Sequence, residues 1–535
     1  MPGWFCCLTA LFSSIGLDLV ATAAEPLHAR IDRFITAGQT GDEKQVSPQA
    51  NDAEFLRRVY LDLAGTIPTP DEVKTFLADS DAKKREKLID KLLASPGYAR
   101  RMAQFFDVVL MERRRDAKVP RAAWEDYLKA AFTENRPYDV FTRELLSADG
   151  VDPKTRPAAK FYLDRDFEPN LVTKDIARVF LGRNLQCAQC HDHPLIDAYK
   201  QSEYFGILAF LNRTSLFPNA TDAKAVLAEK ADGEVNFVSV FDKAKKQNTT
   251  LPRVMAGKSF DEPKLEKGKE YKVAPAKDVR PVPAYSRREQ LAAAMTSADN
   301  PVFARAGANR LWALMLGRGI VNPVDLDHAA NPPSHPELLD LLAKEFASHK
   351  FDVKWLLREI ALSQTYQRSS ELPSGVSEPA ADRYLVAVLK PLSAEQLAYA
   401  SAQAMGAVQK DAAMTTPASN AAGVLPAFRN MFGGQPGQPD TGATTNLDQT
   451  LFLKFGGTVR GMISPRGGSL TDRLTKLSDA NALADELFVS VFSRLPTADE
   501  KRDVAEALKA GPDRVTAIQE LVWALLASAE FRFNH

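Results

Sequence analysis

The chain is poor in cysteine: its 535 residues include four cysteines and seven histidines. Cys6 and Cys7 lie in an apolar N-terminal stretch, so a chain that loses this stretch keeps only Cys187 and Cys190. A chain of this length can bury several cores and does not need disulfides to fold. The scarcity of cysteine therefore excludes a disulfide-built fold and points to a chemical role for the two remaining thiols.

An excess of either charge is also absent. The sequence has 68 Lys plus Arg and 68 Asp plus Glu, and its pI is about 7.1. Without a net field, the protein is not expected to bind nucleic acid or an anionic membrane surface. Its 45% hydrophobic content excludes a disordered or fibrous chain. We expect roughly two to four globular domains.

Two hydrolase signatures are missing as well. The sequence has no Gly-x-Ser-x-Gly elbow and no phosphate-binding glycine loop. Its acidic residues are too scattered to nominate an acid/base pair for glycoside hydrolysis. Nucleophilic hydrolysis is therefore set aside.

The first 24 residues resemble a signal peptide. An apolar stretch ends in the small residues Ala21, Ala23 and Ala24, which a signal peptidase accepts. We expect export to the periplasm or another extracytoplasmic compartment. No later apolar run approaches the ~20 residues that span a bilayer, so the processed chain should be soluble. Because the segment lacks Lys and Arg before its apolar part and contains Asp18, retention as an anchor is the alternative.

The rest of the chain predicts a mainly α fold, with two multi-helix domains joined by a small, charged, β-containing insert. We place the first helical domain at residues 25–214, the insert at 215–285 and the second helical domain at 286–535. Apolar spacing with a period of 3.6 predicts the helices, and alternating or β-branched runs predict the strands. The predicted helices are 55–63, 73–77, 88–93, 124–132, 290–295, 301–316, 336–346 and 353–363, and the predicted strands are 235–241 and 271–274.

Three local signals refine this outline. Ser334 and Glu337 have the spacing of a capping box, which predicts a helix start there. Residues 406–470 are rich in Gly, Pro, Thr and Ala and predict a long loop. A helix, a Pro-Thr turn and two more helices are predicted around Thr69 and again around Thr497, with both threonines as N-caps. This echo is either a recurrent helix-start pattern or a true duplication.

The segment Cys187-Ala188-Gln189-Cys190-His191 is the motif of covalent c-type haem attachment. Two thiols at this spacing can each form a thioether with one vinyl group, and His191 then supplies the axial imidazole to the iron. We therefore predict one covalently bound haem c on Cys187, Cys190 and His191.

The residues after the motif also have ligand-type side chains. His193 is close to His191 in sequence and is expected to act in the second shell, or as an alternative metal ligand. Asp192 either orients an imidazole or belongs to a simple turn. Candidates for the sixth iron ligand are Met102, Met111, His328 and His335, and His335 is also expected at a helix start.

Other readings of the two thiols stay open. Zinc could bind Cys187, Cys190 and His191 or His193, although a closed site needs four ligands and no second pair follows at suitable spacing. A Cys-x-x-Cys redox centre usually lies at a helix N-terminus in a βαβ unit, which this helical surrounding lacks. A structural disulfide is the third alternative.

Nearly the whole processed chain resembles a family of planctomycete cytochrome-like proteins of unknown function, together with the domain of unknown function that usually follows. The matching segments of the first domain are 55–63, 68–70, 135–139, 144–146 and 187–194, the last reading Cys-Ala-Gln-Cys-His-Asp-His-Pro. Those of the second are 300–305, 309–312, 317–321, 331–337, 523–526 and 530–531. One difference is that Leu195-Ile196-Asp197-Ala198 stands where many members have an aromatic residue and an Asp-Pro pair.

The resemblance implies an exported protein, often found beside secreted hydrolases such as sulfatases. Members often carry an extra N-terminal cytochrome c domain that this chain lacks, so electrons would need an external partner. The leading hypothesis is a single-haem redox protein that exchanges electrons with a partner protein or a small oxidant during extracytoplasmic polysaccharide breakdown, in contact with degrading enzymes. The rival hypothesis is a non-catalytic scaffold or carbohydrate-binding protein whose Cys/His segment is a metal or disulfide clip.

Overall fold

The computed structural model describes residues 1, 25–37, 45–218, 224–255, 257, 259–406, 419–439 and 446–535. Apart from Met1, the predicted signal peptide with Cys6 and Cys7 lies outside these residues. The described chain is mainly α, as predicted, and its strands form only two-stranded sheets. None of the helices in these ranges combines the length and the apolar character needed to cross a bilayer.

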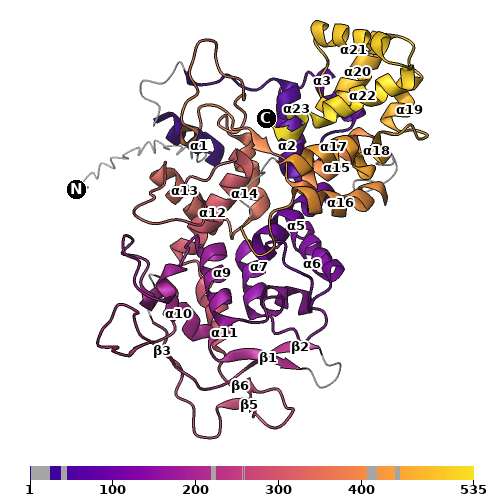
Figure 1. Cartoon of the computed structure of the whole chain (residues 1–535). Coiled ribbons are helices and arrows are strands. Elements are labelled where there is room, and N and C mark those ends of the chain that lie inside the picture. The colour runs from indigo at the N-terminus through magenta and orange to yellow at the C-terminus, as the bar shows by residue number, and fades with distance from the viewer. Residues whose placement is uncertain are drawn as a thin grey trace.

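The helices before the insert, called the N-terminal body below, are coloured from indigo to magenta in Figure 1. Side-chain oxygens of Asn51, Thr69 and Ser95 accept from early amides of the helices that follow them, which fixes three helix starts. The helices are α1 (Leu27–Ala37), α2 (Asp52–Leu63), α3 (Pro70–Ala78), α4 (Lys84–Leu93), α5 (Pro96–Met111), α6 (Arg121–Thr133), α7 (Tyr138–Ser147), α8 (Lys160–Leu163), α9 (Pro169–Leu181) and α10 (Gln201–Leu211), with short 3-10 turns at Arg156–Ala159 and Cys187–Gln189.

The predicted insert contains strands, as expected, in three antiparallel hairpins at the lower end of the molecule in Figure 1. They pair β1 (Thr214–Pro218) with β2 (Ala225–Glu229), β3 (Val235–Phe237) with β4 (Asn248–Thr250), and β5 (Tyr271–Val273) with β6 (Val282–Pro283). Glu234 and Glu262 of the insert each form ion pairs with both Arg213 and Arg287, which flank the insert in sequence. Charge pairing therefore anchors the insert to the helical body.

Helices resume after the insert and continue to the C-terminal end. They are α11 (Arg287–Met295), α12 (Pro301–Leu316), α13 (Pro336–Ser348), α14 (Val353–Leu362), α15 (Ala394–Ala404), α16 (Ser419–Phe432), α17 (Leu447–Phe455), α18 (Gly457–Ile463), α19 (Leu470–Thr475), α20 (Ala480–Phe492), α21 (Ala498–Ala510), α22 (Arg514–Ala527) and α23 (Ala529–Arg532), with a 3-10 turn at Ala381–Arg383. A last pairing joins β7 (Lys390–Pro391) to β8 (Phe533–Asn534), which brings the C-terminal end beside α2 (Figure 1).

Two local predictions are wrong. The capping box at Ser334 does not form: α13 begins at Pro336, so His335 is the N-cap, and it makes no side-chain cap. Proline at the first helical position sets this boundary because its φ suits the helix and it needs no amide partner. Ser334 Oγ instead donates to the carbonyl of Ile320 (3.3 Å).

The predicted long loop at 406–470 is the second error, because α16, α17 and α18 lie within it. Phe428, Phe432 and Phe452 pack ring to ring with centroids 5.3–5.8 Å apart. Burial of these rings stabilises helices that the local composition disfavours. The Gly/Pro-rich part at 433–439 does lack regular structure.

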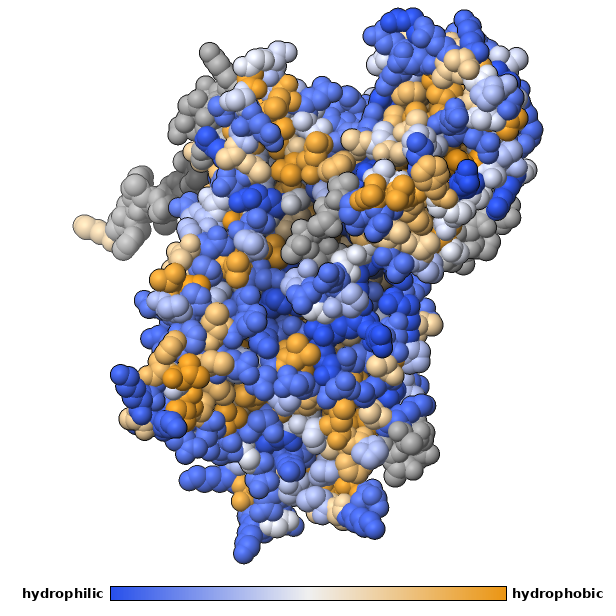
Figure 2. Space-filling view, in the orientation of Figure 1, coloured by the Kyte–Doolittle hydropathy of each residue, from blue (hydrophilic) through white to orange (hydrophobic). Residues whose placement is uncertain are grey.

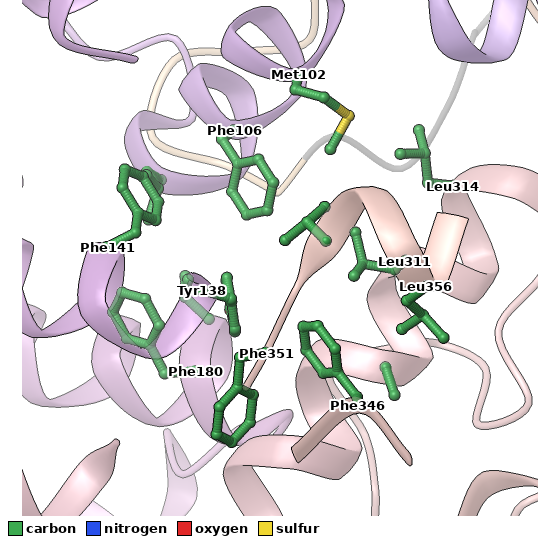
Figure 3. Packing of buried hydrophobic residues seen from close by; sticks show 14 of the residues in the cluster. Met102, Phe106, Tyr138, Phe141, Phe180, Leu311, Leu314, Phe346, Phe351 and Leu356 are labelled. Carbon is green, nitrogen blue, oxygen red and sulfur yellow. The ribbon is translucent and has the colours of Figure 1, made fainter. Parts of the chain in front are cut away.

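Two hydrophobic cores hold these helices, and the second begins well after the predicted boundary at 286. The larger core joins residues between Leu27 and Tyr384 with Val489. Figure 3 shows the centre of this core. There, Phe106 and Tyr138, which precede the insert in the sequence, face Phe346 and Phe351, which follow it. The smaller core takes in residues 392–531 together with Leu61 and Ile67 of the N-terminal body. Each core thus contains residues from both sides of the insert.

The internal echo forms the same local structure twice. The turns pass through left-handed residues, Gly65 (φ +71°) and Ser493 (φ +63°). Thr69 and Thr497 then form complete capping boxes with glutamates three residues on. Both predicted N-caps are therefore confirmed. A recurrent helix-start pattern and a true duplication would each produce this similarity.

Candidate site at the Cys-x-x-Cys-His loop

The motif lies in the loop between α9 and α10, and its backbone turns so that both thiols face outward. Ala188 is fully buried, and the amides of Cys190 and His191 both donate to the carbonyl of Cys187 (3.2 and 3.3 Å). Cys187 and Cys190 are exposed and unbonded. One buried alanine thus anchors a short 3-10 turn that presents two free thiols to a bulky reactant.

Gly182 places this loop against the second half of the chain. It ends α9 in a left-handed conformation (φ +62°), which a residue with a side chain rarely adopts. A Cβ atom at this position would lie 3.1 Å from the carbonyl oxygen of Val324, so the two backbones approach closely. The amide of Asp327 also donates to the Gly182 carbonyl (3.0 Å). The loop after α12 is therefore fixed beside the loop after α9.

The imidazole of His191 has one nitrogen engaged by the backbone. Its Nδ1 lies 2.7 Å from the carbonyl oxygen of Asp192. A carbonyl can only accept, so Nδ1 carries the proton and donates, which leaves the lone pair on Nε2. This is the state in which a histidine ligates a metal, with the tautomer fixed by its backbone partner.

Exposed apolar residues lie close to the motif. The ring of Phe241 contacts that of His191, with centroids 4.7 Å apart, and the amide of Val240 donates to the carbonyl of Cys190 (3.0 Å). Phe241 is 73% exposed, Val240 65% and Leu195 82%. Apolar side chains also gather over α10 and β3 on the face in Figure 2. Clustered exposed apolar surface marks a place where an apolar group or a partner binds.

His193 and Asp192 both shape the loop. His193 Nδ1 accepts from the amides of Leu195 and Ile196 (both 3.1 Å). Asp192 Oδ1 accepts from the amide of Gln201 (2.8 Å) and so tethers the start of α10. No turn forms at Asp192 itself: the turn of this loop lies at Asp197 and Ala198, and the Asp192 side chain serves the start of α10.

Tyr199 connects the motif loop to His328 in the other half of the chain. Its ring stands edge-on to His193 (centroids 6.0 Å apart) and to His328 (5.4 Å). Burial raises the pKa of Tyr199 to about 12. Burial, with Arg183 and His193 nearby, lowers the pKa of His328 below its usual 6.5, so this imidazole is neutral at pH 7. Its Nδ1 atom is buried without a hydrogen-bond partner among the described residues.

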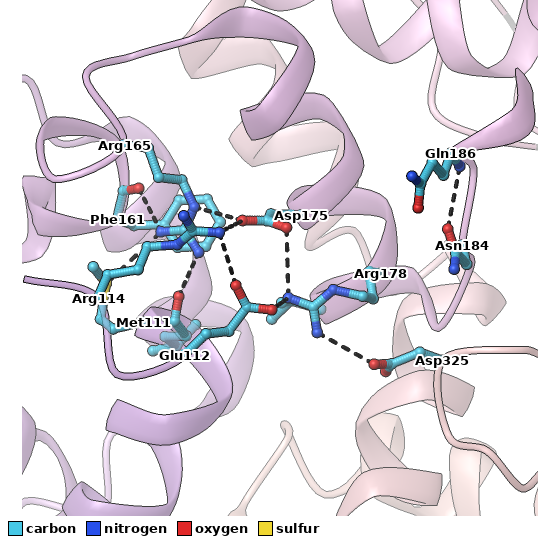
Figure 4. Close-up of polar contacts among 12 residues, drawn as sticks. Met111, Glu112, Arg114, Phe161, Arg165, Asp175, Arg178, Asn184, Gln186 and Asp325 are labelled. Carbon is cyan, nitrogen blue, oxygen red and sulfur yellow. Dashed lines mark hydrogen bonds and ion pairs between the residues drawn. The ribbon is translucent and has the colours of Figure 1, made fainter. Parts of the chain in front are cut away.

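An alternating series of buried and partly buried charges joins α9 to the loop after α12, beside the same motif loop (Figure 4). Arg165 pairs with Asp175 (2.6 Å), and Arg178 pairs with Asp175 (3.5 Å) and with Asp325 (3.3 Å). Arg310 also pairs with Asp325 (2.7 Å). Because removing one partner of a buried pair is strongly destabilising, this series holds α9 and the loop after α12 in one relative position.

The other predicted ligands lie elsewhere. Met102 and Met111 are buried in the larger core, where Met111 Sδ accepts from Arg165 Nη1 (3.7 Å). His335 lies against Tyr384 (ring centroids 5.6 Å apart) and Ser334 Oγ (3.1 Å), and burial lowers its pKa. Of the four candidate sixth ligands, His328 is thus the one whose surroundings include a residue of the motif loop.

Sequence reasoning missed Tyr199, Phe241 and Arg183. Phe241 lies at the end of a strand that the sequence predicted in the insert, and no local pattern links it to His191. Tyr199 follows the motif closely in the sequence, and this closeness could have identified it as a residue of the site. Only the fold brings His328 to it.

The donor set suits a c-type haem better than zinc. Two exposed thiols, an imidazole with a free Nε2 lone pair and adjacent apolar side chains are the groups that thioether formation, axial ligation and a porphyrin face require. In the described part of the chain, no group of three or more Cys, His, Asp or Glu side chains is arranged to hold a metal ion.

Two protein families match the chain. Residues 30–216 match PSCyt2, described as a protein of unknown function (DUF1549), and residues 287–429 match PSD1, also described as a protein of unknown function (DUF1553). No curated protein and no solved structure matches at a significant level. The Cys-x-x-Cys-His loop lies in the first matched region and His328 in the second. The chain therefore carries an N-terminal DUF1549 domain followed by a DUF1553 domain, the two-domain arrangement that the sequence resembles.

Proposed function

We propose that this protein is an exported redox protein that carries one c-type haem on Cys187 and Cys190, with His191 as axial ligand. The observation that carries the proposal is the pair of exposed, unbonded thiols beside an imidazole whose Nδ1 is held by the Asp192 carbonyl. Attachment is balanced without an oxidant: each S–H adds across one vinyl double bond, sulfur to one carbon and hydrogen to the other. The bound haem supplies one-electron chemistry.

The chain's own residues would place and tune that group. Phe241, Val240 and Leu195 offer exposed apolar contact close to His191. Tyr199, through its contacts with His193 and His328, fixes the loop that follows the motif. Because the thiols are exposed, a partner protein or small oxidant can come close enough to exchange electrons. In this proposal the exchange serves extracytoplasmic polysaccharide breakdown, beside degrading enzymes.

The test is to express the full chain in a periplasm together with the c-type maturation machinery and to record its visible spectrum. A Soret band that survives acid-acetone extraction is the expected result. The double variant Cys187→Ala/Cys190→Ala should lose covalent colour. The matched control, His335→Ala, should keep it, because His335 lies against Tyr384. N-terminal sequencing of the product reports whether residues 1–24 are removed.

A colourless wild type would overturn the proposal. If that protein contains an intact Cys187–Cys190 disulfide or bound zinc, the scaffold hypothesis with a structural clip replaces it. A coloured wild type whose colour survives in the double variant would place the haem elsewhere and would equally contradict the assignment.

A further inference from the structure

A second site lies away from the thiols, in a cavity of about 370 Å³ between the two halves of the chain. Its walls come from α5 and α9 of the N-terminal body, from α12, and from the turn between β7 and α15. No residue of the Cys-x-x-Cys-His motif belongs to its lining. The volume falls in the range of small-molecule pockets, which often form where domains meet.

The charges of this lining are almost balanced. Each of its four carboxylates already has a cationic partner at ion-pair distance. The pairs are Asp62 with Lys390 (2.6 Å), Glu112 with Arg178, Asp325 with Arg310 (2.7 Å) and Glu395 with Arg113 (2.8 Å). One cation of the lining, Arg101, is left over.

Arg101 is buried, and the described part of the chain gives it no counter-ion. The residue is 7% exposed, its Nε has no hydrogen-bond partner, and within the described ranges no carboxylate lies within ion-pair distance of it. Its aliphatic part crosses Gly65, where a Cβ atom would lie 2.9 Å from Cδ of Arg101. Burial lowers its pKa, and the charges of Asp62 and Glu395 offset this only in part. An arginine stays protonated in proteins, so this buried charge lacks compensation from the described chain.

Gln104 adds a second unsatisfied group on the same face of α5. It lies three residues after Arg101, lines the same cavity, and its buried Oε1 has no partner in the described part of the protein. Buried polar atoms are nearly always hydrogen-bonded, so two adjacent exceptions facing one cavity point to a ligand.

Apolar side chains form the rest of the wall: Phe105, Val108, Val109, Leu314 and Phe432. A ligand for this cavity therefore needs an apolar body as well as a polar head. The single uncompensated cation favours a head with one negative charge, since a dianion would leave an excess of negative charge in a buried site.

We infer that this cavity binds a small organic monoanion, a carboxylate or a sulfate ester, whose head pairs with Arg101 and hydrogen-bonds near Gln104 while its apolar body packs against α5 and α12. Arginine suits either head because its planar guanidinium can donate two parallel hydrogen bonds. None of the residues that would hold the haem lines this cavity, although Arg178, Arg310 and Asp325 of the lining also belong to the charge series beside the motif loop.

Calorimetric titration of the purified full chain tests this inference. Benzoate and phenyl sulfate are the probes for the two head groups, and benzamide is the neutral match. Both anions, or the one whose head fits, should bind at least tenfold more tightly than benzamide. Arg101→Met should weaken anion binding about 10- to 150-fold, the usual weight of hydrogen bonds to a charged group. Arg115→Met removes an exposed charge outside the lining and should change nothing.

The unliganded variant gives a separate readout. Because Arg101→Met removes an uncompensated buried charge, its urea midpoint without ligand should equal or exceed that of the wild type. The inference is overturned if neither anion binds better than benzamide, or if Arg101→Met binds the anions as well as the wild type. If the wild type binds no anion and Arg101→Met has a lower urea midpoint than the wild type, the inference is overturned and Arg101 has a structural role. Haem content is measured on every sample, so the haem proposal is tested separately from this inference.

Discussion

The phenol ring of Tyr199 stands edge-on to the imidazole of His328, with the ring centroids 5.4 Å apart. Tyr199 follows the Cys-x-x-Cys-His motif in the DUF1549 domain, and His328 lies in the DUF1553 domain. The contact means that the surroundings of the candidate haem site are built by both domains. Through this contact, the second domain helps to hold the motif loop of the first.

His193 should stabilise the loop through its Nδ1 acceptor. In His193→Ala, the amides of Leu195 and Ile196 lose their partner, so their hydrogen exchange should speed up about five- to tenfold, the effect of one ordinary hydrogen bond. His193→Asn keeps an acceptor near the Nδ1 position and should exchange at nearly the wild-type rate. Exchange followed by mass spectrometry reports both. Equal protection in the alanine variant would mean that the bonds to His193 contribute nothing.

Gly182→Ala should loosen the contact between the two halves of the chain. The variant places a Cβ atom 3.1 Å from the Val324 carbonyl and also strains a left-handed backbone. Gly468→Ala strains a similar backbone (φ +82°), but its Cβ atom would meet no described residue within 4 Å. In urea unfolding we expect Gly468→Ala to cost about 1 kcal/mol and Gly182→Ala about 1–3 kcal/mol more. Equal losses would show that the close approach at Val324 is not needed.

Glu395 should make stability fall in acid. Burial raises its pKa, but Arg113 and Arg429 outweigh this and bring it to about 2, from 4.5 in the unfolded chain. The unfolded chain therefore binds the proton more tightly, so the contribution of Glu395 is complete above pH 4.5 and is lost as the pH falls to 2. The shift corresponds to about 3 kcal/mol.

The change Glu395→Gln removes this titration. Unfolding free energies are measured by urea titration at pH 7, 5, 4, 3 and 2. The difference in unfolding free energy between the wild type and this variant should fall by about 3 kcal/mol, and all of this change should occur below pH 4.5. The variant Asp126→Asn, whose side chain is 79% exposed in the wild type, is the control and should follow the wild type. A difference between wild type and Glu395→Gln that does not change with pH would contradict the low pKa.

The two repeated turns should depend equally on their caps. Thr69→Ala and Thr497→Ala each remove an oxygen that accepts from the amide of a glutamate three residues on (both 3.2 Å). Each should cost about 1 kcal/mol of unfolding free energy, and Thr→Ser at either position should restore most of it. A loss at one turn alone would show that the two turns are equivalent in geometry but not in energy.

Much of the helical structure could be predicted from the sequence, because it is set by local forces. The periodic apolar residues of 301–316 coincide with α12, and the polar side chains of Thr69 and Thr497 cap the helices that follow them. The spacing of Cys187, Cys190 and His191 likewise suffices to nominate a haem site. Local signals failed where burial decided the outcome: aromatic residues of α16 and α17 pack against one another and against the smaller core, and Met462 and Ile463 of α18 also pack against that core.

The sequence by itself determined the mainly α fold, most helix positions, the balanced charge and the spacing of the two cysteines and the histidine in the motif. The tertiary structure alone decided that His328, and not His335, comes to the motif loop, and that Phe241 of the insert meets His191. It also decided that Arg101 is buried in a cavity between the two halves of the chain, with no counter-ion among the residues that the structure describes. The reason is that helix formation depends on residues within a few turns, whereas the pairing of charges and rings depends on which distant segments share a core.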